Sequence, residues 1–200
     1  MIISTDIEFA VGRRDPETLR SYRAFKSRQA QLRERPTISG RVVEFLARSA
    51  EPVLYERDLP AMYQSFLHGA FSQSLSSGQN IRALLIHDDQ WEIGHTDDYS
   101  LELWEDADGL QYRLALDHET RLGRLLFNCV KGGHFIGMSM GFRPVALSDI
   151  FYSGETRVFC NVTLSEVSFI LPGWRPIWRT GTARLDVPIS VLRRQLERAL

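Results

Sequence analysis

The sequence reads Gly137-Met138-Ser139-Met140-Gly141-Phe142 at a short apolar stretch that carries one hydroxyl between two glycines. In a β-strand, alternation would direct the two methionines and Phe142 to one face, and Ser139 with the glycines to the other. We therefore expect the apolar side chains to enter a core and Ser139 to stand on a bare face. Glycines beside a hydroxyl leave room for a substrate backbone, as a nucleophile that attacks a peptide carbonyl requires. Because a serine hydroxyl is a weak nucleophile at neutral pH, the chain must also supply a base.

Composition places the chain among ordinary soluble globular proteins. Its 200 residues suffice for one well-buried domain, and 44% are hydrophobic and 24% charged. With 24 Lys and Arg against 25 Asp and Glu, the net charge of -1 gives no reason to expect a nucleic-acid or membrane partner. Cys129 and Cys160 lie in apolar segments without ligand spacing, which predicts reduced core thiols of a cytoplasmic protein. No leader or membrane-spanning run is predicted.

Three parts can be distinguished along the chain. Residues 1–37 are rich in arginine and poor in large apolar residues, and residues 16–35 can form a helix. This part is interpreted either as an arm or pro-segment or as a solvated surface helix. Residues 38–173 form the main domain, and residues 174–200 form a tail that ends in a basic helix.

The main domain is predicted to consist mostly of strands. Strands are expected at 38–46, 81–87, 91–96, 99–105, 110–116, 136–142 and, as a hairpin, 149–171. Helices are expected at 66–75 and 119–130 as long crossings between strands. This order indicates an antiparallel barrel or sandwich with helices packed outside it. We expect an α+β fold, mainly an antiparallel β-barrel with a few surrounding helices.

The base required by Ser139 should be a histidine, since only imidazole has an ordinary pKa near working pH. Of the five histidines, His87 stands at the end of an almost wholly apolar strand and is followed by Asp88 and Asp89. Such a position is typical of a side chain that emerges into a cleft, and equally of a surface histidine.

A third group would orient the imidazole, and Glu166 is the candidate. It lies within Leu164-Ser165-Glu166-Val167-Ser168-Phe169-Ile170, where a carboxylate is costly to bury unless it is paired. Alternation puts Glu166 and Ser168 on one face. An edge strand that turns these polar residues to solvent is the other interpretation.

Together these motifs resemble the phage prohead protease family, capsid-maturation serine peptidases related in fold to herpesvirus assemblin. The resemblance covers roughly residues 38–172. Its landmarks are Gly69-Ala70-Phe71, His87-Asp88 followed by Ile93-Gly94, the Gly-x-Ser-x-Gly-Phe of 137–142, and Leu164-Ser165-Glu166-Val167-Ser168-Phe169 running into Pro172.

The resemblance implies that Ser139 is the nucleophile, His87 the general base and Glu166 the third member. Assemblin relatives use a second histidine in the third place, so His95 is the other candidate there. The Gly-x-Ser-x-Gly motif around Ser139 does not predict a nucleophile elbow, because an elbow needs a helix directly after the serine and Pro144 prevents a helix from starting there. Backbone N–H groups are expected to form an oxyanion hole, with the loop at residues 132–133 as a candidate.

The resemblance also implies an assemblin-like fold and a serine endopeptidase that cleaves capsid precursor and scaffold proteins, and itself, in the immature prohead in the host cytoplasm. It implies no cofactor or metal, and a possible homodimer. The chain departs from the family at His68, at His95 and in residues 172–176, which bears on substrate specificity.

Two other functions remain open from the residues. The first is a catalytically silent capsid assembly or scaffold module with the same fold. The second is a metal-dependent hydrolase that would use His87, His95 and the nearby acidic residues Asp88, Asp89, Asp97 and Asp98, although no helical ligand spacing accompanies them.

Overall fold

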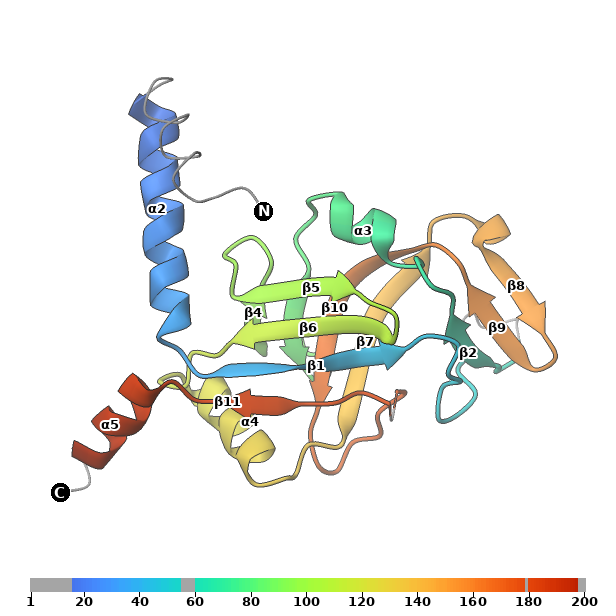
Figure 1. The fold of residues 1–200 in the computed structure, drawn as a ribbon. Helices are drawn as coiled ribbons and strands as arrows, with labels where there is room; N and C mark the ends of the chain where they lie inside the picture. Colours follow the sequence, from blue (N-terminus) through green and yellow to red (C-terminus); the bar gives the residue numbers. More distant parts are fainter. Residues whose placement is uncertain (1–15, 55–59, 179, 198–200) are drawn as a thin grey trace.

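The computed structural model describes residues 16–54, 60–178 and 180–197 (Figure 1). The first fifteen residues of the predicted arm and the last three residues of the predicted tail helix lie outside the described residues. In the described part the chain has an α+β fold with mostly antiparallel strands.

The described strands form three sheets. The first runs in the order β11 (Arg184–Asp186), β1 (Thr37–Glu44), β6 (Gly109–Ala115) and β5 (Leu101–Glu105). The second runs β4 (Glu92–His95), β3 (Arg82–Leu85), β10 (Val162–Ile170) and β7 (Gly137–Pro144). The third runs β2 (Tyr63–Phe66), β9 (Thr156–Phe159) and β8 (Ile150–Ser153). Among these strands, β3 with β10 and β2 with β9 pair in parallel, and the other pairs are antiparallel.

The β-barrel predicted from the sequence is not found as a closed barrel among the described residues, because the strands divide into these separate sheets. The strands of the first sheet cross steeply over β7 and β10 of the second (Figure 1). Tyr112 of β6 meets Phe169 of β10 edge to face, with ring centroids 5.2 Å apart. Both side chains are fully buried. Burial of apolar area between two sheets supplies the core without closure of one sheet on itself.

Helices lie around the sheets: α2 (Pro16–Arg33), α3 (Ser72–Ser76), α4 (Arg121–Lys131), α5 (Ile189–Glu197) and the 3₁₀ turn η1 (Leu147–Asp149). The helix expected at 66–75 is largely wrong. Phe66 instead ends β2 opposite Phe159, and Gly69 adopts a φ of 84° that interrupts a helix, so only α3 remains. None of the described helices is long and apolar enough to cross a membrane.

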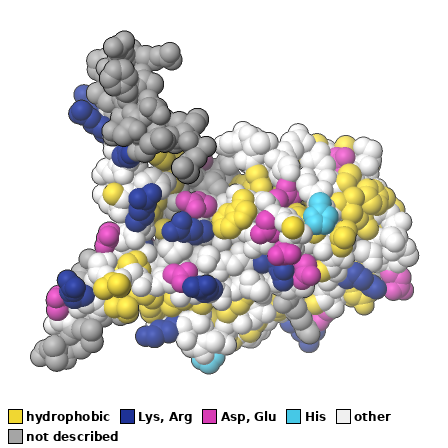
Figure 2. Space-filling view, viewed as in Figure 1, with side chains coloured by type: hydrophobic (Ala, Val, Ile, Leu, Met, Phe, Trp, Pro, Cys, Tyr) yellow, Lys and Arg dark blue, Asp and Glu magenta, His cyan; other side chains and the backbone are white. Residues whose placement is uncertain are grey.

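The helix predicted at the N-terminal end of the chain forms as α2 and stands away from the sheets (Figure 1). It contacts the loop after β4, where Phe25 packs edge to face against Tyr99 at 5.0 Å and Arg28 forms an ion pair with Asp98. Acidic and basic side chains are interspersed over the face shown in Figure 2. This pattern agrees with the small net charge of the sequence.

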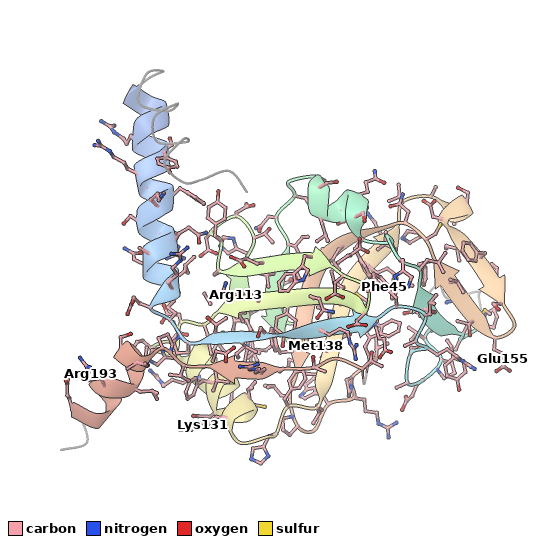
Figure 3. The ribbon with its side chains drawn as sticks, viewed as in Figure 1. Phe45, Arg113, Lys131, Met138, Glu155 and Arg193 are labelled. Carbon is pink, nitrogen blue, oxygen red and sulfur yellow. The ribbon has the colours of Figure 1, made fainter. Side chains whose placement is uncertain are left out.

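The segment after β10 returns to the sheets. Trp178 is 1% exposed and forms an isolated antiparallel bridge with Met138 of β7. Met138, which Figure 3 labels, lies in the middle of the molecule and is fully buried. Further along, β11 pairs with β1 at Ile38. The residues after 173 therefore contribute side chains to the core and a strand to the first sheet.

Candidate active site

Strand β7 carries Ser139 near its start, two residues after Gly137. Met138 and Met140 point into the core, as the alternation predicts, and both are buried. Ser139 points to the opposite face of the sheet but is not on a bare surface, because only 1% of it is exposed. The expectation of an open face is therefore wrong, and the reason is tertiary: other parts of the chain cover this face.

The glycines on either side of Ser139 make that coverage possible. A Cβ on Gly137 would lie 2.8 Å from Cβ of Pro176, and the φ of Gly137 is 149°. A Cβ on Gly141 would lie 2.7 Å from Oε1 of Glu166. The space that the glycines leave is thus occupied by the returning C-terminal segment on one side and by a carboxylate on the other.

The hydroxyl of Ser139 has no hydrogen-bond partner among the described residues. Leaving a buried hydroxyl unpaired costs about 1–3 kcal/mol, so an unpaired one in a well-packed sheet calls for an explanation. One explanation is that this hydroxyl is a nucleophile, which must remain free to attack. In this structure, therefore, Oγ of Ser139 is not hydrogen-bonded to His87.

His87 follows β3 in an unusual backbone conformation. Ile86 and His87 have φ angles of 50° and 62°, which few residues other than glycine adopt. The N–H of Ile86 still donates to the carbonyl of Phe169 at 3.1 Å, so the chain turns only after it has passed along β10. The side chain of His87 is 42% exposed and its Nδ1 lies 2.7 Å from Oε1 of Glu166.

Glu166 lies on β10, which is a central strand because it pairs with β3 on one side and β7 on the other. It is 6% exposed, so the interpretation as a solvent-facing residue of an edge strand is wrong. Oε1 faces Nδ1 of His87, and Oε2 accepts a hydrogen bond of 2.7 Å from the hydroxyl of Ser168. The buried carboxylate thus has a partner on each oxygen, as burial requires.

The geometry fixes the chemical roles that the pair can take. An ionised carboxylate only accepts hydrogen bonds, so in the neutral imidazole this contact assigns the proton to Nδ1 and leaves the lone pair on Nε2. Such an imidazole can accept a proton at Nε2 while the carboxylate stabilises the resulting charge. The half-exposed ring is accessible to a substrate that enters from solvent.

The sheet register brings these groups onto one face. Ser139 lies opposite Ser168, and Gly141 opposite Glu166, across the antiparallel pair β7 and β10. The pairing register shifts between Leu164 and Glu166, beside the carboxylate. Irregularities in strand pairing, such as β-bulges, are common next to active sites. The face therefore presents an unpaired hydroxyl and a His–Glu pair on neighbouring strands.

His95 lies apart from this group. It stands on β4 opposite Arg82, which in turn lies opposite Glu166, so β3 separates the two residues. Its Nε2 is 3.9 Å from Oδ1 of Asp98. Partial burial would raise the pKa of Asp98, but hydrogen bonds from Ser100 and Arg28 outweigh it and hold this pKa below its usual range.

Two other candidates from the sequence, the loop at residues 132–133 and Asp89, are engaged elsewhere. Gly132 and Gly133 end α4, where their N–H groups donate to the carbonyls of Asn128 and Val130, so these donors are not free for an oxyanion. Asp89 pairs with Arg82 at 2.6 Å. Within the ranges described here, no three His, Cys, Asp or Glu side chains gather as metal ligands.

Sequence reasoning did not assign a role to Ser168, which touches both members of the His–Glu pair. The sequence does contain a signal for this role: Ser168 stands two residues after Glu166, and strand alternation puts both side chains on one face.

Comparison with known proteins bears on the same segment. The family model described as Caudovirus prohead serine protease matches residues 27–176, which include β3, β7 and β10. A search of curated proteins found no match.

Proposed function

The chain belongs to the caudovirus prohead serine protease family, and on this premise we propose that it is an endopeptidase that works through an acyl-enzyme at Ser139. Family membership gives the protein a role in phage capsid maturation. The observation that carries the proposal is the contact of 2.7 Å between Nδ1 of His87 and Oε1 of Glu166, beside a buried serine hydroxyl that has no hydrogen-bond partner among the described residues.

In the proposed reaction, Oγ of Ser139 attacks the carbonyl carbon of the scissile peptide while its proton passes to Nε2 of His87. The imidazolium, stabilised by Glu166, then gives this proton to the leaving amine as the C–N bond breaks. Water attacks the acyl-enzyme by the same route, with His87 again as base, and releases the acid. Proton transfer needs Oγ and Nε2 within about 2.6–3.2 Å, a contact that often tightens only when substrate is bound.

The proposed substrates are scaffold and capsid precursor proteins inside the prohead, together with segments of the chain itself. Family membership and the 2.7 Å His–Glu pair support this proposal. We also infer an assemblin-like arrangement, supported by mostly antiparallel strands with helices outside them. A homodimer, and action without direct contact to nucleic acid, are parts of the same proposal.

The test is co-expression of the chain with its capsid precursor, with intact-mass analysis of every product. Ser139→Ala should lower processing by about 10⁴-fold or more, since the nucleophile is removed. Ser76→Ala is the control, because this exposed hydroxyl donates within α3, to the carbonyl of Gln73. Unchanged processing by Ser139→Ala would refute the proposed mechanism.

One observation favours the silent capsid module as a second candidate: Ser139 is 1% exposed and makes no hydrogen bond to His87 or to any other described residue. A fluorophosphonate probe separates the two functions. Labelling of Ser139 during assembly supports the protease. Full capsid assembly with Ser139→Ala, without labelling of the wild-type chain, supports the module.

A further inference from the structure

Ser168 occupies the centre of the face that carries the His–Glu pair. It lies on β10, two residues before the end of the strand, with no exposed surface. The register places it opposite Leu84 of β3 and opposite Ser139 of β7. A serine in this place is enclosed by the two strands that supply His87 and Ser139.

The hydroxyl of Ser168 joins His87 to Glu166. It donates to Oε2 of Glu166 at 2.7 Å and accepts the backbone N–H of His87 at 3.1 Å. Both directions are fixed by chemistry, because a carboxylate can only accept and a backbone N–H can only donate. A single oxygen atom therefore sets the orientation of the carboxylate and the place of the histidine backbone together.

The backbone contact matters because His87 adopts a disfavoured conformation. Its φ of 62° is rare for a residue with a side chain, and such a conformation persists when surrounding contacts hold it. The N–H that Ser168 accepts belongs to this residue. Without that contact the chain could relax toward negative φ, which would swing the imidazole away from Oε1 of Glu166.

We propose that Ser168 is a positioning residue for the reaction, which holds Glu166 and the backbone of His87 so that Nδ1 and Oε1 meet. The inference rests on the proposed function of His87 and Glu166. Ser168 does not touch the substrate in this role. It acts through the geometry of the pair, where a misplacement of about 1 Å can lower a rate by about 10²-fold.

The first test is Ser168→Ala, measured by the rate of fluorophosphonate labelling of Ser139. We expect the maximal labelling rate to fall by about tenfold to a hundredfold with the half-saturating probe concentration unchanged, because orientation and not binding is lost. Ser168→Thr keeps the hydroxyl and should recover most of the rate.

The chain offers a matched control in Ser100, which is 3% exposed, accepts the N–H of His95 at 3.0 Å and donates to the carboxylate of Asp98. Ser100→Ala removes the same kind of contact away from β7. It should lower the melting temperature about as much as Ser168→Ala but leave the labelling rate of folded protein intact. Equal rate losses in both variants would overturn the inference.

A second readout does not depend on activity. In Ser139→Ala protein, the Nδ1 proton of His87 on the carboxylate should give a downfield proton resonance, which Ser168→Ala should remove or shift upfield. If Ser168→Ala leaves this resonance unchanged, the positioning role is refuted. It is also refuted if protein that retains Ser168 shows no such resonance. Activity that survives Ser139→Ala instead refutes the proposed function, so the two failures are distinguishable.

Discussion

Replacing Gly141 with alanine tests whether the position of the Glu166 carboxylate controls the reaction. A Cβ at residue 141 would lie 2.7 Å from Oε1 of Glu166 and 2.9 Å from Oγ of Ser165. The φ of Gly141 is not in the left-handed region, so the backbone accepts alanine and the whole effect comes from these contacts. The substitution therefore acts on the same oxygen that meets Nδ1 of His87.

The size of the effect follows from the distances. Ordinary contact begins at 3.4 Å, so an Oε1 now 2.7 Å from the new Cβ must retreat by about 0.7 Å. Since a misplacement of about 1 Å can lower a rate by about 10²-fold, we expect Gly141→Ala to slow labelling of Ser139 by about tenfold to a hundredfold. Overpacking should also lower stability by about 1–3 kcal/mol.

Fluorophosphonate labelling gives the rate and denaturant unfolding gives the stability. Gly94→Ala on β4 is the control, since its Cβ would lie 2.7 Å both from Cδ1 of Leu114 and from Oγ of Ser100 and its φ is not left-handed. It should lose stability at an unchanged rate. If Gly141→Ala labels as fast as the wild type, or if both variants slow equally, the carboxylate does not control the reaction as reasoned here.

Three further predictions concern other parts of the structure. Glu166→Gln should lower the processing rate by about 10²–10⁴-fold, since an amide cannot stabilise the imidazolium; a loss below threefold in the precursor assay contradicts this. Trp178→Ala should lower the free energy of unfolding by about 3–5 kcal/mol, because this side chain is 1% exposed beside Met138; a urea titration that finds less than about 1 kcal/mol would show that the segment after β10 is weakly docked. The pKa of Asp98 is lowered from 3.8 in the folded protein, so the ionised carboxylate stabilises the fold above pH 3.8, and this stabilisation is lost as the pH falls through the folded pKa. The free energy of unfolding of Asp98→Asn should therefore depend less steeply on pH in the acid range than that of the wild type. Identical pH dependence of the two proteins would refute the lowered pKa.

Local pattern was enough to predict several elements. The alternation around Ser139 predicts a strand with both methionines inward, and β7 has that arrangement. The hairpin expected at 149–171 forms in part, because β8 and β9 pair as its antiparallel arms, while the rest of the segment continues separately as β10. These features depend on period and turn chemistry, which neighbouring residues carry by themselves.

Other expectations failed where residues distant in the sequence determine the local structure or the exposure of a side chain. The exposure of Ser139 depends on what covers β7, and Pro176 and Glu166 come from elsewhere in the chain. The apolar run at 66–75 has helical spacing, but pairing of Phe66 with Phe159 takes its first residue into a strand. The donors of Gly132 and Gly133 are used by α4, which a Gly-Gly pair alone does not reveal.

The stretch around Ser139 determined by itself that a strand would carry one hydroxyl on the face away from its methionines, because side-chain direction in a strand is a local property. The landmarks in the sequence were also sufficient to indicate the family. Only the tertiary structure decided that Glu166 lies on a central strand 2.7 Å from His87, with Ser168 hydrogen-bonded to both residues. The physical reason is that β3, β7 and β10 become neighbours only through sheet pairing across the fold, and the register of that pairing sets which side chains meet.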